Sequence, residues 1–155
     1  MDDNYDSESY DRIERQIMIN ATLDRVWDLV STPGWWVPTK AEEPVVRTPG
    51  HQAVRHNETY GRFVVEVVSI EPKTYAAFRW ASQFPNEELA PGRTTLVEFR
   101  VEPGDQGVNV SVVESGFASL DAPEAQRKAG FEHNTEGWKL EMDVLKEQAE
   151  GAATA

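Results

Sequence analysis

The stretch Glu136-Gly137-Trp138-Lys139-Leu140-Glu141-Met142-Asp143-Val144-Leu145-Lys146 decides the fold of this chain. Its tryptophan, its methionine and its last leucine recur at helical spacing, in line with Phe131 upstream, and they form one apolar stripe. The charged residues between them belong to the opposite, solvated side of the same helix. A long helix with one apolar stripe needs a partner surface, and the large apolar segments that could supply it lie upstream.

This C-terminal helix is expected to span 121–150. The segment Asp121-Ala122-Pro123-Glu124 is a typical helix start: aspartate can cap the first amides, proline loses no bond in the first turn, and glutamate suits the positive end of the helix dipole. Two glycines interrupt the helical pattern. We expect Gly137 to allow close approach of a sheet and Gly130 to mark a kink.

The upstream chain reads as a strand, a short helix and a series of strands. Segment 12–20 alternates between isoleucine and polar residues, which predicts a half-buried strand. Segment 20–30 predicts an amphipathic helix that Asn20 or Thr22 can cap. Further strands, separated by turn residues, are predicted at 52–60, 62–71, 74–83, 93–102 and 107–116. The short connections favour antiparallel pairing, so the pattern predicts an α+β fold in which a curved sheet grips the final helix.

Length and composition bound the function. The chain has 155 residues, no cysteine and a formal net charge of -12, which indicates one domain without disulfides or thiolate metal sites. The negative charge disfavours nucleic acid as a partner, and no segment is apolar enough to insert into a membrane. We expect a cytoplasmic protein with a disordered acidic tail at 1–9, a single domain at 10–150 and a disordered C-terminal tail at 151–155.

Several segments together resemble a known family: Val68-Ser69-Ile70-Glu71-Pro72-Lys73-Thr74-Tyr75-Ala76-Ala77-Phe78-Arg79-Trp80, Thr95-Leu96-Val97-Glu98-Phe99, Val112-Val113-Glu114-Ser115-Gly116-Phe117, and Gly137-Trp138 followed by Leu145. This family is named after the C-terminal domain of the heat-shock protein 90 ATPase activator and belongs to the START-like, or SRPBCC, superfamily. The resemblance covers about 11–149. It implies a helix-grip (START/Bet v 1-like) fold: six or seven curved antiparallel strands around a long C-terminal helix, with short helices after the first strand.

The resemblance also implies a hydrophobic cavity between sheet and helix, and the inward faces of the predicted strands allow one. A packed aromatic core without a cavity is the alternative. If a cavity exists, we expect it to hold a small hydrophobic or amphipathic molecule, because aromatic rings and methionine suit such a guest. The candidate ligand-binding residues are Trp35, Trp36, His56, Phe63, Phe78, Trp80, Phe84, Phe99, Glu114, Phe117, Trp138 and Met142.

Glu114 is the most unusual polar residue because it continues an inward row of valines on the strand 107–116. An inward carboxylate needs a partner or a raised pKa, and Arg79, Arg55 and His56 are candidate partners by position. Such a group could anchor a ligand or act as a general acid or base. The alternative is a strand end at which Glu114 reaches solvent.

Neither a metal site nor a cofactor site is predicted. His51, His56 and His133 do not form a zinc motif, and the sequence has no phosphate loop, dinucleotide fingerprint or nucleophile elbow.

Three functions remain after this reading, in order. The first is ligand binding in the cavity. The second is acid/base catalysis of the aromatase/cyclase type by Glu114, as in relatives within the superfamily. The third is regulation of a chaperone ATPase, ranked last because an activator of that type carries an extra N-terminal domain. A homodimer is compatible with each.

Overall fold

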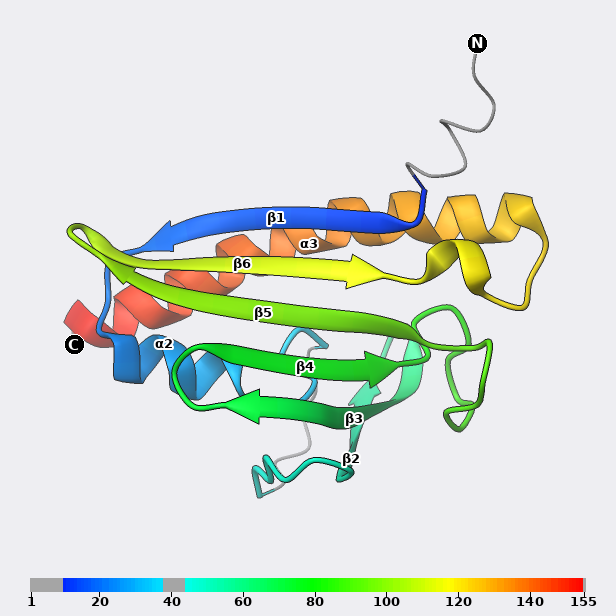
Figure 1. The fold of residues 1–155 in the computed structure, drawn as a ribbon, viewed down its shortest axis with the longest axis horizontal. Coiled ribbons are helices and arrows are strands. Elements are labelled where there is room, and N and C mark those ends of the chain that lie inside the picture. Colours follow the sequence, from blue (N-terminus) through cyan, green and yellow to red (C-terminus); the bar gives the residue numbers. More distant parts are fainter. Residues whose placement is uncertain (1–9, 38–43, 155) are drawn as a thin grey trace, which may run out of the picture.

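The computed structural model describes residues 10–37 and 44–154, which form a sheet and a long helix lying against it (Figure 1). The elements in chain order are β1 (Arg12–Ile19), α2 (Leu23–Val30), β2 (Gln52–Asn57), β3 (Gly61–Glu71), β4 (Tyr75–Trp80), β5 (Thr95–Gly104), β6 (Gly107–Ser115), the 3-10 helix η1 (Phe117–Ser119) and α3 (Glu124–Thr154). Each predicted strand and helix is therefore present.

The sheet has six strands in the order β1-β6-β5-β4-β3-β2, and every neighbouring pair is antiparallel. β1 is the first strand in sequence and yet pairs with β6, the last, so the chain returns to its start before α3 begins. α3 then packs against β1, η1 and α2. This arrangement confirms the α+β helix-grip fold.

Local hydrogen bonds explain where the element boundaries differ from the predicted ones. β2 ends at Asn57 rather than 60, because the Asn57 side chain accepts from the amides of Thr59 and Tyr60 and closes a turn. α3 begins at Glu124, later than the predicted 121, and continues to Thr154. Residues 151–154 are thus helical rather than a disordered tail, and the acidic tail at 1–9 lies outside the described residues.

α2 covers one end of the sheet and leads into the turn that carries two tryptophans. The Thr22 hydroxyl caps it by accepting from the amide of Arg25 at 3.2 Å, which selects Thr22 over Asn20 as the cap. Val26 and Val30 are fully buried on its inner face. In the described residues α2 is the one helix between β1 and β2, whereas short helices in the plural were expected.

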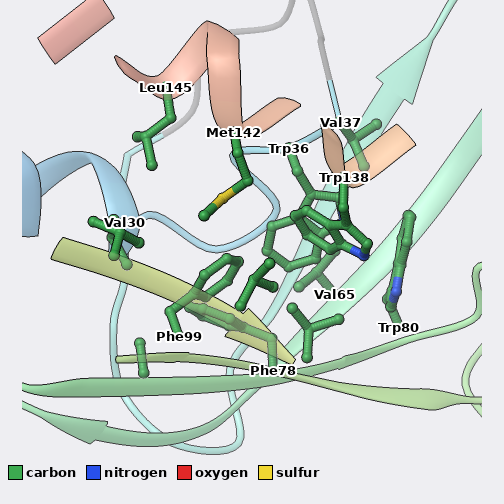
Figure 2. Packing of buried hydrophobic residues seen from close by; sticks show 14 of the residues in the cluster. Val30, Trp36, Val37, Val65, Phe78, Trp80, Phe99, Trp138, Met142 and Leu145 are labelled. Atoms are coloured by element: carbon green, nitrogen blue, oxygen red, sulfur yellow. The ribbon is translucent and has the colours of Figure 1, made fainter. Parts of the chain in front are cut away.

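Aromatic side chains dominate the core between sheet and helix. Trp36 lies at its centre, with its ring 5.4–6.0 Å from five other rings, which include those of Phe78, Phe99 and Trp138. Figure 2 shows Met142 and Leu145 of α3 pointing down into the same cluster, opposite Phe78 and Phe99 from the sheet. The predicted stripe of α3 is therefore the surface that the sheet grips.

The β5–β6 hairpin makes a testable demand on Gly107. This residue has a φ of +136°, and a Cβ there would overlap the backbone carbonyl of Ile19 at the end of β1. We expect Gly107→Ala to lower the free energy of unfolding by about 2 kcal/mol or more, because neither clashing group is a flexible side chain. Urea denaturation measures the loss.

Gly104→Ala is the matched control, since its Cβ would find its nearest listed neighbour, the carbonyl oxygen of Gly107, at an ordinary 3.8 Å. An equal loss in both variants would show that the hairpin, rather than the contact with β1, sets the cost.

Candidate functional site

Glu114 lies at the centre of the site as a fully buried carboxylate that accepts four hydrogen bonds. Its Oε1 accepts from the indole Nε1 of Trp138 at 2.7 Å and from Nδ2 of Asn134 at 3.1 Å. Its Oε2 accepts from the indole Nε1 of Trp80 at 2.8 Å and from the Thr95 hydroxyl at 2.5 Å. None of these partners carries a charge.

Sheet register and helix spacing bring these five residues together. Glu114 in β6 pairs with Val97 in β5, and Thr95 in β5 pairs with Trp80 in β4, so the three polar side chains share the inward face near one end of the sheet. Asn134 and Trp138 are one helical turn apart on the same face of α3. The carboxylate therefore connects three strands to the helix.

The surroundings of Glu114 act on its pKa in opposite directions. Burial raises the pKa of Glu114 above its ordinary value, and the hydrogen bonds from Thr95, Trp138, Trp80 and Asn134 lower it, with burial the larger effect. An indole N–H can only donate, so each carboxylate oxygen is committed to accepting one bond. The Thr95 hydroxyl is the partner that can also accept, so a proton on Glu114 would sit between Oε2 and Thr95.

These contacts correct the sequence-based expectations for Glu114. It does not reach solvent, and its partners are neutral donors rather than Arg79, Arg55 or His56. Arg79 alternates with its inward neighbours on β4 and is exposed on the outer face. Arg55 and His56 belong to β2, which β3, β4 and β5 separate from β6.

A pocket of about 450 Å³ lies beside this cluster, between α3 and the β2–β4 side of the sheet. Two of its lining residues, Tyr60 and Leu140, are among the exposed large hydrophobic residues, so the pocket opens to solvent at that side. Figure 2 shows Trp36, Trp138 and Trp80 side by side near this wall. The described lining residues are Trp36, Val37, Asn57, Tyr60, Phe63, Trp80, Ser82, Pro85, His133, Asn134, Glu136, Gly137, Trp138, Leu140 and Glu141.

Four of the predicted ligand-binding residues line this pocket, namely Trp36, Phe63, Trp80 and Trp138. Glu114 lies behind them, bonded to two of the lining indoles. The other predicted residues are placed elsewhere, because the aromatic core fills the space under the middle of the sheet. They are Trp35, Phe78, Phe99 and Met142 within the packed core, Phe84 beneath Arg93, Phe117 against Phe131, and His56, which is exposed on β2.

Sequence reasoning missed several lining residues on α3. Asn134 and Glu141 flank Trp138 at helical spacing, and this spacing was the available signal. The expected roles of the two glycines are also wrong. Gly137 has no atom within 4 Å of its would-be Cβ and lines the pocket, whereas Gly130 is the glycine that a sheet-side residue, Gln83, approaches closely.

The described residues contain no group of three or more histidine, aspartate or glutamate side chains arranged to hold a metal ion. Within the same ranges, no helix has the length and apolar character needed to cross a bilayer.

Comparison with known families gives the relationship of the chain. The sequence model described as "Activator of Hsp90 ATPase homolog 1-like protein" matches residues 20–150. The chain belongs to this family. A comparison with curated protein sequences finds no match.

Solved structures share the fold of this member of the activator-like family at low sequence identity. MLL2253 from Mesorhizobium loti has a TM-score of 0.66 and 18% identity, over 88% of this chain and 94% of that protein. The Aha1 dimer from Colwellia psychrerythraea has a TM-score of 0.65 and 14% identity, over 89% and 95%. DynU16, from the dynemicin biosynthetic locus, has a TM-score of 0.67 and 19% identity, over 90% of this chain and 47% of DynU16. These likenesses show the fold alone.

Glu114→Gln tests the carboxylate as the connection between sheet and helix. Whichever way the amide turns, its NH2 group faces an indole N–H, because each carboxylate oxygen accepts from one tryptophan. We expect the free energy of unfolding at neutral pH to fall by about 2–3 kcal/mol. Urea denaturation followed by tryptophan fluorescence measures it. Glu102→Gln, at an exposed position of β5, should change it little.

The pH dependence of stability tests the charge of the same group. Because the pKa of Glu114 is raised in the folded state, its stabilising contribution is complete below the unfolded-state pKa and is lost as pH rises through the folded-state pKa. The stability difference between the wild type and Glu114→Gln should therefore shrink as pH rises from about 4 toward neutrality. A difference that grows with pH would show that the four donors outweigh burial.

Proposed function

We propose that this protein binds a small hydrophobic or amphipathic molecule, with a lipid-like, aromatic or polyketide-like body, in the pocket between α3 and the sheet. The observation that carries the proposal is the pocket itself, at about 450 Å³ and walled by Trp36, Phe63, Trp80 and Trp138. Ligand sites are typically concave, mostly apolar and about 300–1,000 Å³ in volume. The fold of the family supports the same reading, since a helix-grip sheet leaves space at one end of its helix.

The wall of the pocket is held rigidly, which favours binding over adaptation of the core. Two of its indoles are fixed through their N–H groups to one buried carboxylate, so their ring planes are set before a ligand arrives. Preorganised aromatic surface lowers the ordering cost of binding. Glu114 accordingly acts as a positioning residue.

Glu114 does not line the pocket, and four donors occupy its oxygens. A general acid or base must come within hydrogen-bond reach of the reacting atom. This geometry argues against aromatase/cyclase chemistry by Glu114 and leaves binding as the better supported function. No contact among the described residues favours a chaperone partner over a small molecule.

The first experiment is native mass spectrometry of the purified full chain, followed by denaturing extraction. We expect a stoichiometric adduct of apolar character when the protein is isolated from its own source. Recovery of a bare mass, together with failure to bind the neutral probe described below, would contradict the proposal.

Gly137→Leu should block the pocket without unfolding the protein. A side chain at Gly137 meets no atom within 4 Å at its Cβ and lies in the pocket wall, while loss of a helical glycine stabilises α3 by up to about 1 kcal/mol. We expect the neutral fluorescent probe N-phenyl-1-naphthylamine to bind the wild type and to bind this variant at least about tenfold more weakly, a change that corresponds to about 1.4 kcal/mol.

Gly151→Leu is the matched control for this experiment. It makes the same substitution in the same helix, at an exposed position that does not line the pocket and where a Cβ also meets no atom within 4 Å. Equal probe affinity in the wild type and both variants would place the binding site elsewhere.

A further inference from the structure

The charged groups on the pocket wall are mostly of one sign. Among the described residues, the wall contains the carboxylates of Glu136 and Glu141 and the imidazole of His133, and it contains no lysine or arginine. Lys139 lies on the same helix between the two glutamates, but it is exposed and is not part of the wall. A guest in the pocket therefore meets negative charge from α3.

Glu141 is the more informative of these carboxylates. Its side chain is only partly exposed, and within the described residues it has neither a hydrogen bond nor an ion pair. Burial raises its pKa, which shows that its negative charge is poorly solvated. A half-buried carboxylate without a partner, at the edge of an apolar pocket, is stabilised when a cation approaches.

The aromatic wall favours the same sign of charge. Faces of tryptophan and tyrosine attract cations, and the pocket offers Trp36, Trp80, Trp138 and Tyr60. Elsewhere, the chain's own cations already occupy ring faces, with Arg93 over Phe84, Arg100 over Tyr75 and Lys128 over Tyr10. In the described part of the molecule, no such pair involves a ring of the pocket wall.

We infer that the pocket selects an amphipathic cation, that is, an amine or quaternary ammonium group joined to an apolar body. The apolar body lies against the tryptophans, and the cationic group lies near Glu136 and Glu141. Trp138 is between these two glutamates in sequence on the same helix, so one ligand can contact the ring and a carboxylate together. A ligand with a carboxylate head, such as a free fatty acid, is disfavoured by the same charges. This inference rests on the proposed function and specifies its ligand class.

The test compares three probes that share one alkyl chain and differ in charge: octyltrimethylammonium, 1-octanol and octanoate. Binding to the full-length protein is measured near pH 7 by calorimetry and by tryptophan fluorescence, below the concentrations at which the probes form micelles. We expect the cation to bind about tenfold more tightly than the alcohol, and octanoate to bind most weakly.

A pair of variants locates the source of the preference. Glu136→Gln combined with Glu141→Gln removes two charges from the wall and should lower affinity for octyltrimethylammonium about tenfold while leaving affinity for 1-octanol unchanged. Glu132→Gln combined with Glu147→Gln is the matched control. It removes the same charge from exposed positions of α3 that do not line the pocket.

Each outcome is decisive. Equal affinities for the three probes, or tightest binding of octanoate, would overturn the cation preference and leave the binding function standing. Equal losses in the two double variants would attribute the preference to the overall charge of -12 rather than to the pocket, and would also overturn it. Failure of all three probes to bind, together with failure of the neutral naphthyl probe, would overturn both proposals.

Discussion

A single carboxylate buried between sheet and helix sets the geometry of this end of the molecule. Glu114 is fully buried, and burying a charge is costly unless hydrogen bonds replace its hydration. Four neutral donors from β4, β5 and α3 supply that replacement. Removing any of them exposes the remaining groups to the full cost of desolvation, so the cluster fixes α3 against the sheet in one position.

The pocket depends on this cluster. Trp80 and Trp138 present their N–H groups to the carboxylate and belong to the wall of the open space beside it. Trp36 packs edge-on against the first of these rings and tilted against the second, and so closes the inner end of the wall. The same contacts that stabilise the fold therefore determine the shape of the surface that a ligand would meet, and the function class follows from them.

Sequence patterns predicted the architecture well because strands and helices announce themselves locally. Alternation marked the strands, and the spacing of Trp138, Met142 and Leu145 marked the gripped face of α3. The site was predicted only in part. Periodicity shows that Glu114 faces inward, but it does not show which side chains from distant segments meet it. Arginines were expected, and indoles and an asparagine are present, because partner identity depends on register across β4, β5 and β6 and on the rotation of α3.

The sequence by itself determined the order of elements, the antiparallel pairing, the apolar face of the final helix and the inward direction of Glu114, since each follows from spacing along one segment. Only the tertiary structure decided which aromatics fill the core and which line a pocket. Phe78 and Trp80 share a face of β4, yet the first is packed under other rings and the second borders open space. That difference arises from how far α3 and the Trp36 turn extend over each position, and no local pattern encodes that distance.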